Sequence, residues 1–192
     1  MARKRRALSP RMVYHICNRA TEKVRLFSSD DDYELWIKTF REALDRYPLE
    51  VYGYCLMPNH WHLLISCRES AMISRALKWL GATHAIRWRK RSESIGRGAV
   101  YQSRYRCHAV RANQIFLVVA RYIERNPVRA GLCKQPKDWR WSSLGQSDKT
   151  IPITVWPMRK PEDWDLFMTH GGCELQEQQI RKALLTGQPF IG

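Results

Sequence analysis

Residues 49–67, LEVYGYCLMPNHWHLLISC, decide the fold of this chain. Two largely apolar runs, 49–57 and 60–67, flank the pair Pro58-Asn59, and Pro and Asn are residues that favour turns. Apolar runs of this length bounded by turn residues are typical of buried strands. The sequence therefore predicts two antiparallel strands joined as a hairpin.

The second of these strands opens with two histidines, His60 and His62. Side chains alternate along a strand, so both rings point to the same face, about 6–7 Å apart at ~3.3 Å per residue. Two imidazoles at this distance can chelate one cation, or they can be core histidines with satisfied partners. The spacing alone leaves both interpretations open. The remaining histidines have no same-face partner in the sequence and are expected to be structural or on the surface: His15, His84, His108 and His170.

The elements around the hairpin give the fold class. A strand is predicted at residues 12–17, and a helix begins at the capping and acidic residues 28–32 and is stopped by Pro48. A second helix spans about 70–91, a fourth strand covers 106–110, and a third helix starts at Asn113 and is halted near Pro127. This order is the split βαβ, ferredoxin-like arrangement, an α+β fold with an antiparallel sheet.

The composition shifts after residue 131, which suggests two parts. Residues 1–132 are expected to form one domain with a basic N-terminal tail at 1–9. Residues 133–192 are expected to form an irregular and partly helical extension, with a last helix at 174–185, that packs on the domain and could contact DNA. Its start contains Trp139 and Trp141, and three prolines follow between residues 152 and 161.

The charge of the chain points to a polyanionic partner. A formal net charge of +15 and a pI near 9.9 are typical of proteins that bind nucleic acid. No run approaches the ~18 apolar residues of a membrane span, and no apolar core follows the basic N-terminus, so we expect a cytoplasmic protein. The six cysteines are scattered without a C-x-x-C pair, which gives no support for a zinc finger and favours buried thiols.

The third helix carries the residues that could react with a phosphate. Tyr122 and Asn126 are four apart, so they share one helix face. Placed against His60 and His62, they would surround one cavity with two imidazoles, an amide and a phenol. A cation held by neutral ligands keeps positions open for phosphate oxygens, and the phenol could attack phosphorus. Tyr122 could equally be a packing residue and Asn126 a helix cap, and the rival nucleophiles are Tyr14, Tyr101 and Tyr105.

Basic residues alternate with aromatic ones in two segments, 87–91 and 104–106. Arginine and lysine neutralise phosphates, while the rings of Trp88 and Tyr105 could stack on unpaired bases. The basic N-terminal tail could enter a groove, as basic arms do. The residues predicted to bind nucleic acid are Arg3, Lys4, Arg5, Arg6, Arg87, Arg89, Lys90, Arg91, Arg104, Arg106, Arg125 and Arg129.

Four segments together resemble a known family. They are residues 13–16 (VYHI) with Arg19, residues 54–64 (YCLMPNHWHLL), residues 121–132 (RYIERNPVRAGL) and residues 139–144 (WRWSSL). The chain is similar to the single-tyrosine HUH transposases, and within them to the REP-associated tyrosine transposases. The resemblance implies an HUH endonuclease type of fold, metal-ligating His60 and His62, a nucleophilic Tyr122 and a third polar ligand at Asn126.

The resemblance also implies an activity. Members of this family use Mg²⁺ or Mn²⁺ to nick single-stranded DNA beside an imperfect hairpin. The nick leaves a 5′-phosphotyrosine and a free 3′-OH, so strands can be rejoined without a nucleotide cofactor. We expect a monomer, since the REP-associated branch can act as monomers, over the homodimer of the insertion-sequence relatives. The end of the chain resembles a C-terminal R-G-R-P-F-G signature of that branch, with Thr186 and Gln188 in place of its arginines.

Two other functions stay open at this point. One is a non-catalytic regulator of the same fold that binds hairpin DNA and whose histidines are structural. The other is a zinc hydrolase built on the H-x-H pair, which would need a carboxylate ligand. Glu124 is the nearest candidate, but it lies about 200° around the helix from Tyr122 and should face away.

Overall fold

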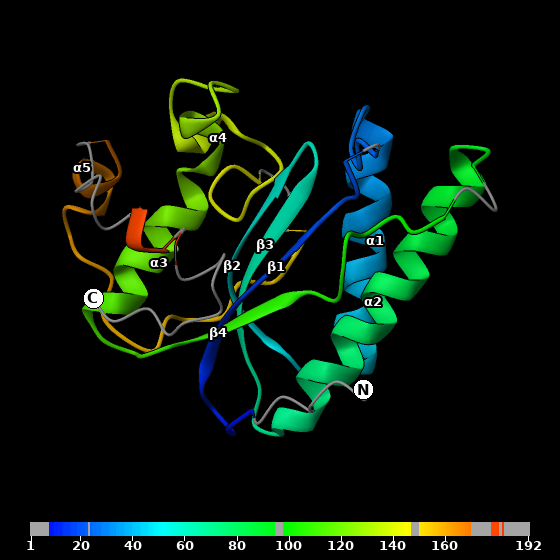
Figure 1. The fold of residues 1–192 in the computed structure, drawn as a ribbon. Helices are drawn as coiled ribbons and strands as arrows, with labels where there is room; N and C mark the ends of the chain where they lie inside the picture. The colour runs from blue at the N-terminus through cyan, green and yellow to red at the C-terminus, as the bar shows by residue number, and fades with distance from the viewer. Residues whose placement is uncertain are drawn as a thin grey trace.

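An antiparallel sheet lies at the centre of the computed structural model, which describes residues 8–22, 24–94, 98–146, 150–169, 178–180 and 182. Within these residues the sheet has four strands in the order β2-β3-β1-β4 (Figure 1). Their bounds are β1 Val13–Arg19, β2 Glu50–Met57, β3 His60–Ser66 and β4 Arg106–Val110. The β2-β3 hairpin is confirmed, with its turn at Pro58-Asn59.

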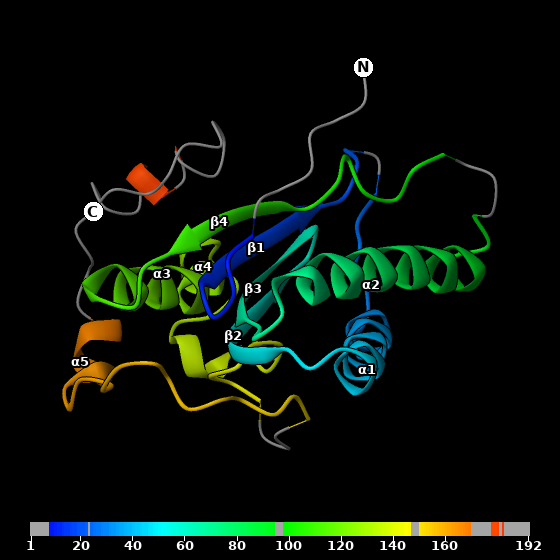
Figure 2. The same ribbon diagram turned by 90° about the horizontal axis from the view of Figure 1, so that it is seen from below.

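Helices cover both faces of this sheet, as Figures 1 and 2 show. On one face, the helices α1 (Asp30–Arg46) and α2 (Ser70–Arg91) pack together, and α3 (Gln114–Glu124) lies on the other face. The alternation along β3 explains this division: Trp61 and Leu63 belong to the core beneath α1 and α2, whereas Leu64 belongs to the core beneath α3. Element order and sheet order together confirm the predicted ferredoxin-like α+β fold.

The third helix stops just before Pro127, near the predicted end. It ends at Glu124, and a separate short helix, α4 (Asn126–Arg129), follows. Pro127 has no N–H with which to continue the helical ladder. The side-chain amide of Asn126 donates instead to the carbonyls of Tyr122, at 3.0 Å, and Ile123, at 3.3 Å. Asn126 therefore does not continue the helix of Tyr122, yet it is bonded to the end of that helix.

The segment after α4 lies along the outer edge of β2. It begins with a short 3-10 helix, η1 (Pro136–Asp138), after which Leu56 N–H donates to the Trp141 carbonyl at 2.9 Å and Ser143 N–H to the Tyr54 carbonyl at 2.9 Å. Further along, Trp156 and the short helix α5 (Trp164–Thr169) reach the core beneath α3.

Some predicted features lie outside the described residues. These are Arg3, Lys4, Arg5 and Arg6, His170, the 174–185 helix apart from 178–180 and 182, and the end of the chain with Thr186 and Gln188. Among the helices that the structure describes, none has the length and apolar character needed to cross a bilayer.

Candidate active site

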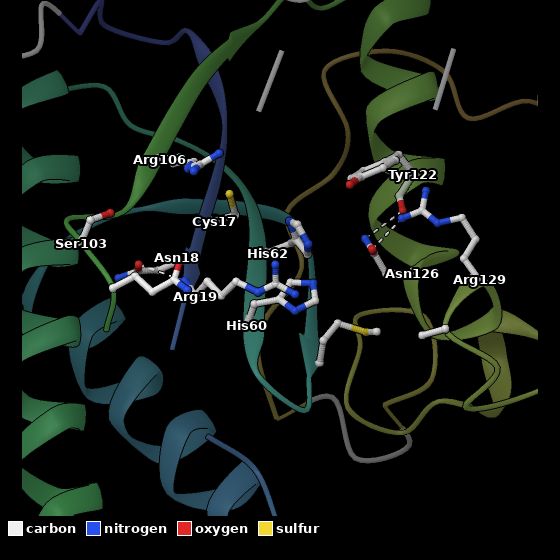
Figure 3. A pocket seen from close by; sticks show the side chains of 13 residues that line it. Cys17, Asn18, Arg19, His60, His62, Ser103, Arg106, Tyr122, Asn126 and Arg129 are labelled. Atoms are coloured by element: carbon white, nitrogen blue, oxygen red, sulfur yellow. Dashed lines mark hydrogen bonds between the residues drawn. The ribbon is translucent and has the colours of Figure 1, made fainter. Parts of the chain in front are cut away.

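A cavity of about 560 Å³ opens between the sheet and the end of α3 (Figure 3). It brings together all four residues predicted to carry the chemistry, namely His60, His62, Tyr122 and Asn126. Three arginines from different elements share its lining. These are Arg19 of β1, Arg106 of β4 and Arg129 of α4. Residues distant in sequence thus converge on one concave, positively charged site.

Both histidines line this cavity, and each has a polar partner at Nδ1. Their ring centroids are 5.0 Å apart and the rings are nearly perpendicular. His60 Nδ1 lies 2.7 Å from the Asn59 side-chain oxygen, so this nitrogen is the donor and Nε2 keeps its lone pair. His62 Nδ1 lies 2.9 Å from His15 Nε2, while His62 Nε2 is buried and has no hydrogen-bond partner in the structure.

Burial keeps both imidazoles neutral. Burial, with a smaller effect of the nearby Arg19 and Arg129, lowers the pKa of His60 to about 4. The pKa of His62 falls well below its usual value for the same reason, with the other histidines and the two arginines adding to the effect. A neutral imidazole is the form that binds metals. The pair is therefore in its ligand form at neutral pH.

Tyr122 projects from α3 towards the histidines. Its ring centroid lies 5.9 Å from that of His62 and 6.0 Å from that of His15. The guanidinium carbon of Arg129 is 4.1 Å from the centre of the phenol ring, a cation–π contact. Arg129 also donates to Asn126 Oδ1 at 2.6 Å (Figure 3). Because the Asn126 side-chain nitrogen is bonded to the end of α3, its side-chain oxygen lies beside the positively charged Arg129.

The rival tyrosines lie elsewhere. Tyr14 OH accepts from the Ser9 backbone at 2.7 Å, Tyr101 OH pairs with His84 Nδ1 at 2.8 Å, and Tyr105 OH is bonded to Ser74. Of the tyrosines in the described part of the chain, Tyr122 alone lines the cavity. This location separates Tyr122 from the other candidates.

No aspartate or glutamate lines the cavity within the described residues, and these residues hold no cluster of three or more His, Cys, Asp or Glu suited to a metal. Glu124 is buried on another side of α3, where the Ser143 hydroxyl donates to it at 3.5 Å and burial raises its pKa to about 7. The site thus lacks the carboxylate ligand that a zinc hydrolase would need. The five cysteines that the structure describes are free thiols; Cys55 and Cys67 are buried as expected, whereas the other three are only half-buried.

His15 is the site residue that the sequence did not reveal. We expected it to lack a same-face partner, and that expectation is wrong, because β1 pairs with β3 and brings His15 to His62. Alternation within residues 12–17 does place His15 on a definite face. The partner strand and its register decide which residue it meets, and no single-sequence pattern shows them. His84 and His108 are buried, as a structural role requires.

The predicted nucleic-acid contacts fall into different environments. Arg106 and Arg129 line the cavity, and Arg104 and Lys90 are exposed. Four more are held by contacts within the protein. Arg87 pairs with Glu42 at 2.7 Å, Arg91 with Asp31 and Asp32, Arg89 with the Ser94 carbonyl, and Arg125 with the Met168 carbonyl.

The predicted stacking of Tyr105 on bases is wrong, whereas that of Trp88 stays a prediction. Trp88 donates its indole N–H to the Leu26 carbonyl at 2.8 Å and packs against the core. Tyr105 is buried in the same core. The Tyr105 ring is therefore part of the protein interior, and the Trp88 ring is half-buried at its edge.

The family to which this chain belongs follows from its similarity to known proteins. The family described as IS200-like transposases matches residues 9–126, which contain the cavity's histidines, Tyr122 and Asn126. The chain belongs to the IS200-like transposase family. The resemblance noted in the sequence is thereby confirmed.

Individual relatives of this IS200-like transposase are distant. A Haemophilus influenzae protein, whose name assigns it provisionally to the REP-associated tyrosine transposases, is 24% identical over 133 residues, or 65% of this chain and 72% of its own. A solved REP-associated tyrosine transposase, bound to a REP hairpin, aligns with a TM-score of 0.58 at 18% identity and covers 84% of this chain and 93% of its own. At that identity the likeness shows a shared fold.

Proposed function

We propose that this IS200-like transposase is a metal-dependent enzyme that nicks single-stranded DNA beside a palindromic hairpin and can rejoin the strands. Tyr122 would be the nucleophile and would form a 5′-phosphotyrosine intermediate. The observation that supports this proposal most strongly is the cavity, where a tyrosine, two neutral imidazoles, an amide oxygen and three arginines converge. This combination suits the transfer of a phosphoryl group.

The donors in the cavity suit a divalent cation, Mg²⁺ or Mn²⁺. His60 Nε2, His62 Nε2 and Asn126 Oδ1 would hold it, and the buried, unpartnered His62 Nε2 is the atom that most needs such a partner. A bound cation would withdraw charge from a phosphoryl oxygen. The protein's own contribution is to keep the two imidazoles neutral and to turn the Asn126 oxygen away from the helix end.

Tyr122 needs positive charge nearby, because a phenol with an ordinary pKa near ~10 is a weak nucleophile at neutral pH. Arg129 supplies such a charge at the face of its ring. In the proposed step the Tyr122 oxygen bonds to phosphorus and the bond from phosphorus to the 3′ oxygen breaks. The phenol proton is transferred overall to that leaving oxygen. The new ester replaces one phosphodiester bond by another, so the reverse step needs no nucleotide cofactor.

The substrate we propose is single-stranded DNA with a hairpin. The support is the net charge of +15, the arginines of the cavity and the REP hairpin bound by the structural relative. We also propose that the protein acts as a monomer in the cytoplasm, for the reasons given in the sequence analysis.

The test is an adduct assay on a denaturing gel. Labelled single-stranded DNA carrying a palindromic hairpin from the host genome is mixed with the protein and either Mn²⁺ or EDTA. We expect a covalent adduct with Mn²⁺ that Tyr122→Phe abolishes, while hairpin binding stays nearly intact because only a hydroxyl is lost. Tyr105→Phe is the matched control and should still form the adduct, since its hydroxyl bonds to Ser74 outside the cavity.

Either of two results would contradict the proposal. An adduct that persists in Tyr122→Phe would show that Tyr122 is not the nucleophile. An adduct that forms fully in EDTA would show that no metal is needed. Tight hairpin binding without any adduct in the wild type would favour the non-catalytic regulator.

A further inference from the structure

The strand pairing places a third histidine directly behind the two imidazoles proposed to bind the metal. β1 and β3 are antiparallel, and Cys17 is paired with His62 while His15 is paired with Leu64. His15 and His62 are therefore diagonal neighbours on the same face of the sheet, where side chains are within reach of each other. Their rings meet at 2.9 Å between His15 Nε2 and His62 Nδ1, and both side chains are buried.

We propose that His15 is a positioning residue whose Nε2 accepts a hydrogen bond from His62 Nδ1–H, so that the lone pair of His62 Nε2 faces the cavity. This inference deepens the proposed function and rests on it. His15 would act through His62, since its own Nε2 is occupied by this hydrogen bond.

Two arrangements of protons are compatible with the 2.9 Å contact, because a neutral imidazole has one donor and one acceptor. In the first, His15 donates and His62 carries its proton on Nε2. That N–H would be buried without an acceptor, which is rare in folded proteins. In the second, His62 donates from Nδ1 and Nε2 is a bare lone pair.

The charges of the site favour the second arrangement. Arg19 and Arg129 line the cavity that His62 faces, and their positive charges act on this ring. A lone pair directed towards positive charge is favourable, whereas an N–H dipole pointing the same way is unfavourable. Ligating histidines usually donate their other nitrogen to a second group that fixes the tautomer. Asn59 fills this place for His60, and His15 fills it for His62.

The packing around His15 keeps its ring in place. It contacts Tyr122 edge-on, at 6.0 Å between ring centroids, and lies opposite His108 of β4. His15 thus links the nucleophile's ring to one of the two proposed metal ligands. To accept at Nε2 it must carry its own proton on Nδ1.

The tautomers can be measured in the wild type by ¹⁵N NMR of histidine-labelled protein without metal. We expect His62 to be protonated on Nδ1 and His15 on Nδ1. The second readout is the Mn²⁺ dissociation constant of the DNA-free protein, measured by electron paramagnetic resonance. His15→Leu should weaken Mn²⁺ binding by about tenfold or more, the usual cost of losing such a partner. His15→Gln offers an acceptor oxygen and should restore most of the affinity.

His84→Leu is the matched control, because His84 is also buried and bonded to a side chain, Tyr101, outside the cavity. It should leave the Mn²⁺ affinity unchanged. Protonation of His62 on Nε2 in the wild type would overturn the inference, and this result does not depend on any variant folding. Wild-type Mn²⁺ affinity in a folded His15→Leu protein would overturn it as well. If Mn²⁺ does not bind the wild type, or binds equally well to His60→Ala, the metal site in the proposed function is refuted, and the tautomer measurement still tests the role of His15.

Discussion

Burial of the two cavity histidines sets the pH range in which they can bind a cation. An exposed histidine has a pKa of ~6.5 and is about nine-tenths protonated at pH 5.5. The pKa of His60 is lowered to about 4 and that of His62 is also well below the usual value, so both lone pairs stay available at that pH. Because their pKa values are lowered, both imidazoles stay neutral to a more acidic pH than an exposed histidine does. Proton competition should therefore begin only as the pH approaches the lowered values.

We expect the Mn²⁺ affinity of the wild type to be nearly constant from pH 8 to about 5.5 and to fall below about pH 5, as measured by titration calorimetry. Ordinary histidines would lose about tenfold in affinity per imidazole between pH 7 and 5.5. A loss of that size would show that the rings are more solvated than the structure has them. His60→Ala, which should bind Mn²⁺ weakly at every pH, is the control.

At the scale of elements, the segment beside β2 depends on a close backbone approach at Gly145. A Cβ added there would lie 2.1 Å from the Trp139 carbonyl oxygen, which no side chain can occupy. Gly145→Ala should therefore lower the free energy of unfolding by roughly 1–3 kcal/mol, in the range of overpacked sites. Gly81→Ala is the control: it lies inside α2 with nothing within 4 Å, and alanine should stabilise the helix by roughly 0.5–1 kcal/mol. Urea unfolding measures both, and equal stability of the two variants would contradict the prediction.

The elements also show which parts of the structure a sequence can predict. Residues 70–91 and 106–110 form α2 and β4 as expected, because apolar spacing and caps are local signals. The end of the third helix near Pro127 was predicted for the same reason, because proline cannot continue the helical ladder. The hydrogen bonds from the Asn126 side chain back to the carbonyls of Tyr122 and Ile123 were not predicted. The pairing of β1 with β3 depends on the whole sheet. For that reason His60 and His62 were found in the sequence and His15 was not.

At the scale of the whole molecule, the count of 33 lysines and arginines overstates the number of cations that can meet DNA. Arg87 and Arg91 form ion pairs with acidic residues of α1, so acidic side chains of the same chain already neutralise their charges. Arg106 lies at the cavity and is exposed. Basic residues in the same chain should therefore differ in how much they contribute to nucleic-acid binding.

The salt dependence of hairpin binding tests this difference. Each phosphate neutralised by the protein releases counterions, so log K falls with log[salt] by roughly 0.7 per contact on single strands and 0.9 on duplex. Arg106→Ala should reduce the slope by about one contact and weaken binding at low salt. Arg87→Ala should leave the slope unchanged while lowering stability, because it breaks the contact between α2 and Glu42 of α1. Fluorescence anisotropy with a labelled hairpin at several salt concentrations measures both slopes. If Arg87→Ala reduced the slope as much as Arg106→Ala, the ion pair to Glu42 would have to open when DNA binds, and the end of α2 would belong to the DNA interface.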